Sequence, residues 1–179
     1  MKSANTCLYS TTRTPERESQ FYWIGKITNL TTALFAKAGR GIKLETLEDA
    51  KQFSIAVMKD DYFHQSLLRK GVVENQNLYV NNSYAALSYL LDIPNRQIDL
   101  VIANAAHMPY RLSDNQTLDD VEMVLDVKEL QSELYLACNK KTDPELVSSL
   151  KNSMKKLADS GELVRIERTW IAQSKFKSL

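Results

Sequence analysis

The sequence predicts an α/β protein. Short apolar runs alternate along the chain with longer amphipathic segments, as they do in proteins whose strands and helices alternate. The 179 residues suffice for one ordinary domain or two small lobes. The 44% apolar and 25% charged residues are ordinary globular values, so the composition excludes disordered, collagenous and coiled-coil chains.

In the first half of the chain, apolar runs predict strands and capping residues predict helices. Thr46 is a suitable N-cap, and Asp49 three residues later is its capping-box partner. Gly71 is a suitable end for a helix, because glycine accepts the left-handed conformation that follows many helices. We therefore expect strands at 7–10, 31–37, 53–58 and 78–80, an aromatic-rich segment at 21–24, and helices that begin at Thr46 and span 62–70.

The second half repeats the alternation and then becomes helical. Ser83 can cap a helix that Pro94 ends, and Pro144 fits the first position of a later helix. We expect strands at 98–103, 121–127 and 134–138, a short helix from Ala105, a long helix with the apolar stripe Leu146, Leu150, Met154 and Leu157, and a last helix from Glu162.

Charge and cysteine content limit the partners and the compartment. Lys plus Arg number 23 against 22 for Asp plus Glu, so no overall field favours nucleic acid. Cys7 and Cys138 can form one bridge or remain two buried thiols, and the thiols are favoured because free cysteine is commonly a small core residue.

No apolar run approaches the ~20 residues that cross a bilayer, and the first six residues contain no signal-peptide core. The chain is therefore cytosolic or begins after a leader.

Sequence motifs of enzymes are missing. His64 and His107 stand outside any metal-ligand spacing, and the sequence has no phosphate-binding glycine motif and no nucleophile elbow. The paired acids Asp60-Asp61 and Asp119-Asp120 stand where helix starts or turns favour carboxylates. We expect no catalytic residue, no cofactor and no metal ion.

One polar segment, residues 10–18, is unusual for a surface loop. The hydroxyl groups of Ser10 and Thr12 precede the guanidinium of Arg17. A guanidinium offers two parallel donors to a carboxylate, and hydroxyls can donate to its remaining lone pairs, so this set suits an anionic ligand group. The alternative is that Arg13 and Arg17 pair with the nearby glutamates, and the spacing leaves both interpretations open.

The same segment resembles a known family. Residues 14–17 (Thr-Pro-Glu-Arg), followed by Trp23, are similar to the first crossover of family 3 extracellular solute-binding proteins, the polar amino acid binding proteins of bacterial ABC transporters. Further partial motifs of the family follow in the same order, at 47–50, 96–100, 135–137, 140–142 and 157–161 with Ile166 and Trp170. The resemblance covers nearly the whole chain.

The resemblance implies a type II periplasmic binding protein fold, in which two α/β lobes are joined by two crossover strands and close by a hinge. Residues 26–133 would form a complete second lobe, and residues 1–25 and 134–179 a partial first lobe. The family's first βαβαβ stretch has no counterpart before Cys7. A half-built lobe exposes apolar surface, so we expect a homo-oligomer, such as a dimer with swapped C-terminal helices.

The resemblance also implies ligand-binding positions. Arg17 matches the arginine that pairs with the ligand α-carboxylate, and Ser10 and Thr12 match the positions just upstream. Asp60-Asp61-Tyr62 stand where the family has a Gly-Thr/Ser-Thr run that holds the same carboxylate. Asn104 stands where the family has the aspartate that binds the α-amino group. Two acids at the helix start repel an anion, and neutral Asn104 cannot pair with an ammonium, so an ordinary α-amino acid fits this site poorly.

The leading functional interpretation is a non-catalytic solute-binding protein of the ABC-transporter type, or a shortened relative of it, for an amino acid or related small polar ligand. The resemblance implies a periplasmic location and a membrane permease or receptor as partner. The alternative is a sensory or scaffold module of the same fold that has lost ligand binding and acts through protein–protein contact. An enzyme on this fold, such as a dehydratase of prephenate-like acids, is disfavoured because no acid–base pair accompanies Arg17.

Overall fold

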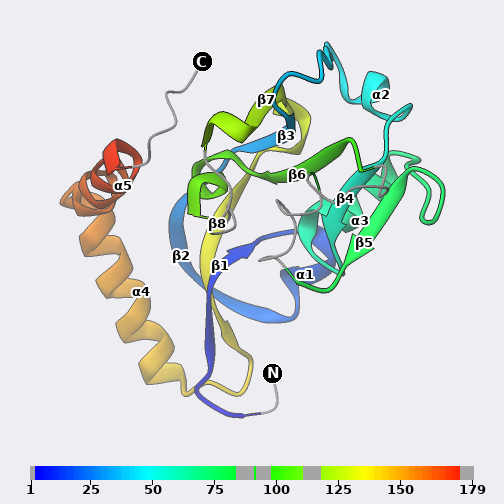
Figure 1. Cartoon of the computed structure of the whole chain (residues 1–179). Coiled ribbons are helices and arrows are strands. Elements are labelled where there is room, and N and C mark those ends of the chain that lie inside the picture. The colour runs from blue at the N-terminus through cyan, green and yellow to red at the C-terminus, as the bar shows by residue number, and fades with distance from the viewer. Residues whose placement is uncertain (1–2, 84–90, 92–97, 111–117, 174–179) are drawn as a thin grey trace. The chain divides into compact units, whose positions relative to one another are not determined.

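The computed structural model describes residues 3–83, 91, 98–110 and 118–173 (Figure 1). The helix expected between Ser83 and Pro94 lies outside the described residues. The chain divides into two compact units: unit 1 comprises Met1–Leu30 and Ser132–Gln173, and unit 2 comprises Thr31–Gln131. The division falls after β2 and before β8, because both of these strands run without interruption through unit 1.

Unit 1 is built on a three-stranded antiparallel sheet with the order β1-β8-β2. Its strands are β1 (Cys7–Thr12), β2 (Phe21–Leu30) and β8 (Ser132–Asn139), and its helices are α1 (Pro15–Glu18), α4 (Pro144–Asp159) and α5 (Glu162–Gln173). The two edge strands both pair with β8, so the return strand holds the sheet together.

Helix α4 begins as the sequence predicts and packs along β2 (Figure 1). Its cap, Asp143, accepts hydrogen bonds from the amides of Glu145 and Leu146 at 2.8 and 3.2 Å. Gly25 of β2 permits a close approach, because a Cβ at this position would lie 3.0 Å from the Cβ of Met154.

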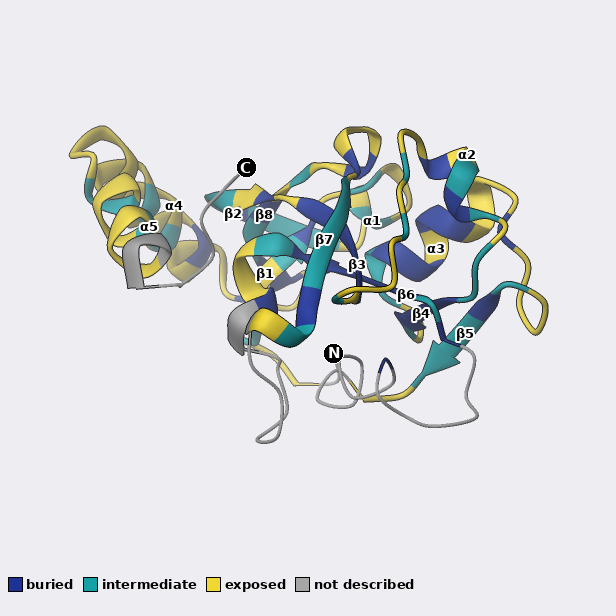
Figure 2. Ribbon diagram, turned by 45° about the horizontal axis from the view of Figure 1, so that its top comes forward, coloured by how far each residue is buried: buried dark blue, intermediate teal, exposed yellow. Residues whose placement is uncertain are grey.

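The buried stripe of α4 differs from the predicted one. Val147 is buried, and Leu150 and Met154 pack with it against the sheet. Leu146 and Leu157, by contrast, are 39% and 38% exposed. Figure 2 shows that α4 and α5 are largely exposed, so this helix pair buries only part of its apolar surface within the described residues.

Cys7 and Cys138 form a disulfide bond, so the favoured expectation of two thiols is wrong. They are paired partners in the register of β1 with β8, and their Cα atoms are 3.9 Å apart. The pairing of the two strands therefore places the sulfur atoms side by side. The bond joins the first strand of unit 1 to its central strand.

Unit 2 is a five-stranded mixed sheet with the order β5-β4-β6-β3-β7. Strands β4, β5 and β6 are parallel, whereas β3 is antiparallel to both β6 and β7. The strands are β3 (Thr32–Lys37), β4 (Ile55–Met58), β5 (Leu78–Asn81), β6 (Leu100–Asn104) and β7 (Val121–Asp126), with helices α2 (Leu47–Ala50) and α3 (Tyr62–Arg69) and single 3-10 turns at Ala105–Tyr110, Leu118–Asp120 and Lys128–Leu130.

The core of unit 2 lies around its central strands. All five residues of β6 are buried, as are the first five residues of β3. Near-continuous apolar runs are typical of strands covered on both faces, which explains why these segments lack a polar alternation. The predicted capping box opens α2: the Thr46 hydroxyl accepts from the Asp49 amide, and the Asp49 carboxylate accepts from the Thr46 amide. No helix among the described residues is both long and apolar enough to cross a membrane.

Candidate functional site

Unit 1 carries the polar segment that the sequence analysis singled out, and Arg17 lies at its centre. The half-buried side chain of Arg17 donates from Nη1 to the backbone oxygen of Thr12 at 3.4 Å. Thr12 itself is buried. Among the described residues, no carboxylate lies within ion-pair distance of Arg17. Its guanidinium is therefore held in place with donors to spare.

Arg13, in contrast, pairs with a carboxylate and packs against two aromatic rings. Its Nε and Nη2 donate to the two carboxylate oxygens of Glu18 at 2.7 and 2.5 Å. Its guanidinium also lies 5.4 Å from the ring centre of Trp23 and 5.5 Å from that of Tyr135. The hydrogen bond from Arg13 lowers the pKa of Glu18, and the same bond raises the pKa of Arg13. Pairing with glutamate thus occurs at Arg13 and not at Arg17.

The aromatic residues of the first crossover pack within unit 1. Trp23 donates from its indole nitrogen to the backbone oxygen of Glu18 at 3.2 Å, and its ring meets those of Phe21 and Tyr135 edge to face. A hydrogen bond from Lys26 lowers the pKa of the adjacent Glu133. These contacts fix the segment that carries Arg17.

In unit 2, the start of α3 is organised around His64. This residue, for which the sequence motifs indicate no role, is only 4% exposed. Its Nδ1 accepts from the Asp60 amide at 3.0 Å, and its Nε2 lies 2.7 Å from the carboxylate of Glu74. Its own amide donates at 2.8 Å to the side chain of Asp61, which is the N-cap of α3. The sequence gives no local signal for this network, because Glu74 lies ten residues away on a loop.

Asn104 lies at the same edge of the unit 2 sheet as the start of α3. It ends β6, which is parallel to β4, and β4 leads into Asp60, Asp61 and Tyr62. The carboxyl ends of neighbouring parallel strands meet at one edge, so unit 2 brings these four candidate residues together. Asn104 is 5% exposed, and its side-chain oxygen accepts from the Ala106 amide at 2.9 Å.

Two candidate residues have an unusual backbone conformation. Four non-glycine residues of the described chain have positive φ: Asn5, Ser10, Asp60 and Asn75. Ser10 and Asp60 are both at φ 58°; asparagine and aspartate tolerate this region, whereas serine bears a greater cost. Strained backbone persists where the surroundings enforce it, and it is concentrated at ligand sites. In each unit, one such position coincides with a residue that the resemblance marks for ligand binding.

Within the described part of the chain, no group of three or more His, Cys, Asp or Glu side chains is placed to hold a metal ion. Of the two acids at the start of α3, Asp61 uses its carboxylate as the helix cap, whereas the carboxylate of Asp60 is largely exposed. The amide of Asp60 donates to His64. Unit 2 therefore presents two carboxylate side chains at the start of α3.

Comparison with known proteins identifies similar folds among solved structures but no close relative by sequence. No protein-family model matches the sequence, and no curated protein sequence is significantly similar to it. Among solved structures, a histidine kinase sensor domain with similarity to periplasmic binding proteins matches with a TM-score of 0.77 at 20% identity, over 92% of this chain and 68% of that one. An amino acid ABC transporter substrate-binding protein from Streptococcus pneumoniae, bound to L-arginine, matches with a TM-score of 0.72 at 19% identity, over 94% and 68%.

A third similar structure is an ancestral amino acid-binding protein that is a precursor of cyclohexadienyl dehydratase. It matches with a TM-score of 0.70 at 18% identity, over 90% of this chain and 66% of that one. The chain thus spans about two thirds of each of these proteins. The likeness shows that this α/β chain has the periplasmic-binding-protein fold, with one lobe only partly represented.

Proposed function

We propose that the protein is a non-catalytic solute-binding protein, or a shortened relative of one, for an amino acid or a related small polar ligand. The fold supports this proposal, because proteins named as amino acid-binding are among the similar structures.

The observation that carries the proposal is the state of Arg17. The guanidinium of Arg17 is half-buried and pairs with no carboxylate of the described residues, although Glu18 is adjacent and pairs with Arg13. Within the described part of the chain, its side chain donates to the backbone oxygen of Thr12, which leaves further guanidinium donors for a ligand carboxylate. A second observation supports the proposal: Ser10, on the same strand as Thr12, has a left-handed backbone conformation.

The chemistry of unit 2 limits the ligand class. Asp60 and Asp61 offer carboxylates at the start of α3, so this unit favours a cationic or hydroxyl-rich group over an anion. Each unit taken by itself suits one ligand group: a carboxylate suits Arg17, and a cationic or hydroxyl group suits the acids at the start of α3. Basic amino acids and hydroxylated amino acids carry both groups.

The proposal predicts a specific thermal shift. A screen of amino acids, polyamines and small carboxylates should contain a ligand that stabilises the protein by about 2.7 kcal/mol at 100 times its dissociation constant. Replacing Arg17 with alanine should abolish the shift, because the ligand carboxylate loses its partner. Arg168, an exposed arginine on α5, provides the matched control, and Arg168→Ala should leave the shift intact. A screen without any shift, together with an inert Arg17→Ala variant, would favour the alternative function.

That alternative is a sensory or scaffold module of the same fold, which acts through contact with a membrane protein or with a second copy. The similar histidine kinase sensor domain supports it, as does the apolar surface on α5, where Val164, Ile166 and Trp170 are 48%, 40% and 58% exposed. The disulfide bond agrees with the proposed location outside the cytoplasm, where such bonds persist.

Both functions include the proposal that the partial lobe is covered by a second copy of the chain. Light scattering coupled to size exclusion should therefore give the molar mass of a dimer at micromolar protein concentration. The double variant Ile166→Glu/Trp170→Glu should give the molar mass of a monomer, because it places two charges on the apolar surface of α5. The matched control Lys155→Glu changes the charge of α4 at an exposed site and should leave the mass unchanged. A monomer at every concentration would exclude the covered lobe.

A further inference from the structure

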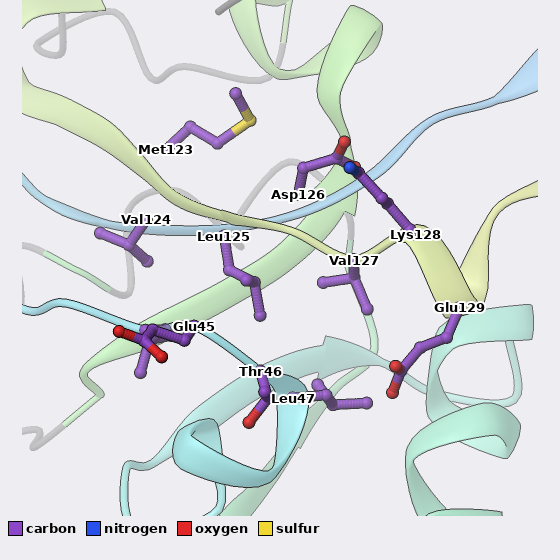
Figure 3. A pocket seen from close by; sticks show the side chains of 11 residues that line it. Glu45, Thr46, Leu47, Met123, Val124, Leu125, Asp126, Val127, Lys128 and Glu129 are labelled. Carbon is purple, nitrogen blue, oxygen red and sulfur yellow. The ribbon is translucent and has the colours of Figure 1, made fainter.

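A groove in unit 2 lies apart from the candidate ligand residues. It has a volume of about 500 Å³ and is lined by residues 44–47 and by residues 123–129. The first wall is the segment that leads into α2, and the second is β7 with the turn that follows it (Figure 3). No candidate site residue of the sequence analysis lines it.

One wall of this groove is the last strand of the sheet, as far as the described strands extend. In the sheet that the structure describes, β7 pairs with β3 alone and is the last strand. The Val127 amide donates to the Thr32 oxygen at 2.9 Å, and the next pair along, Ala33 and Asp126, is therefore a non-hydrogen-bonded pair. The backbone N–H and C=O of Asp126 consequently face away from β3. These groups can bind another extended chain.

The side chains of the groove are apolar on one side and acidic around it. Leu125 and Val127 extend toward Leu47 at the start of α2, as Figure 3 shows. Val127 and Leu47 are buried, whereas Met123, Val124 and Leu125 are partly exposed and can contact a partner. The charged residues of the lining are three carboxylates, on Glu45, Asp126 and Glu129, and one ammonium, on Lys128. Glu129 is partly neutralised by Lys70 at 3.3 Å. The remaining excess of negative charge favours a cationic partner.

We propose that this groove binds an extended segment of a partner protein, in which basic and apolar residues alternate, as an added strand on β7. The backbone edge would bind the main chain of the segment, the apolar side chains would take one face of it, and the carboxylates would pair with its basic residues. A second copy of this chain fits less well. Antiparallel pairing of β7 with the β7 of a second copy would bring the carboxylates of Glu122 and Asp126 from the two copies close together, and like charges opposite each other destabilise a strand pair.

The first test uses the peptide acetyl-Val-Lys-Val-Lys-Val-Lys-Val-amide, with a second peptide that has Glu at each Lys position. Titration calorimetry on the full chain should detect binding of the Lys peptide and at least tenfold weaker binding of the Glu peptide. Hydrogen exchange should show protection of the Asp126 amide upon binding. Equal affinity for the two peptides, unchanged exchange at β7, or no binding at millimolar concentration would overturn the proposal.

Variants separate strand addition from simple charge attraction. Asp126→Pro removes the outward amide and leaves the hydrogen bonds between β7 and β3 in place, so it should weaken peptide binding at least tenfold. Asp126→Ala removes only the charge of the side chain, so it should weaken peptide binding by only a few-fold. Glu45→Lys should weaken binding about fivefold, and Lys128→Glu should strengthen it by a similar factor. Asp159→Lys, on the end of α4, is the matched control and should have no effect. If Asp126→Pro does not fold, protection of the Asp126 amide by the Lys peptide in the unaltered protein decides for strand addition, and its absence decides against it.

Discussion

Removal of the disulfide between Cys7 and Cys138 is expected to lower the free energy of unfolding by about 4 to 5 kcal/mol. The bond closes a loop with a sequence separation of 131 residues, which includes the whole of unit 2. In the chain-entropy account, a loop of this length strongly restricts the unfolded state when it is closed. The loss should be greatest for β1, because β8 is the strand to which β1 pairs in the described sheet.

The measurement is urea unfolding of the oxidised protein, the reduced protein and the double variant Cys7→Ser/Cys138→Ser. The reduced protein and the double variant should have the same stability, and dithiothreitol should have no effect on the double variant. Unchanged midpoints after reduction would show that the pairing of β1 and β8 alone holds the strand in place. A further loss of stability of the double variant in dithiothreitol would show that the reductant acts elsewhere.

Local patterns in the sequence predicted much of the fold. The capping box of Thr46 and Asp49, the Asp143-Pro144 helix start and the buried runs of β3 and β6 depend on neighbours within a few residues. Such features follow from backbone chemistry that acts locally, so they can be recognised without a structure. The fold class, confirmed by the similar structures, follows from the order of these elements.

Features that depend on distant pairing could not be predicted in the same way. The disulfide requires the register of β1 against β8, and cysteine spacing alone does not contain that register. The choice between Arg13 and Arg17 as the partner of Glu18 depends on the rings of Trp23 and Tyr135, which hold Arg13. The ligand role of Arg17 remains a prediction, and the structure adds to it the finding that no described carboxylate neutralises this residue.

Replacing His64 with leucine is expected to destabilise unit 2 by about 3 kcal/mol, because it removes a buried acceptor and a partner of a carboxylate at once. The Asp60 amide donates to Nδ1, so the proton of the neutral imidazole is on Nε2 and is donated to Glu74. Leucine fills a similar space but leaves the Asp60 amide without its acceptor. Asp60 then loses the contact that holds its left-handed backbone, at φ 58°.

The two roles of His64, packing and positioning, can be separated experimentally. Urea unfolding measures the stability, and hydrogen exchange at Asp60, Asp61 and Tyr62 reports the order of the helix start. Glu74→Gln keeps an acceptor for Nε2 and leaves the Asp60 contact intact, so it should cost less than 1 kcal/mol and leave this exchange slow. If His64→Leu lowers stability while exchange at Asp60 stays slow, His64 is a packing residue only. Fast exchange confined to the start of α3, with loss of any ligand-induced thermal shift, would identify His64 as the residue that positions the candidate site of unit 2.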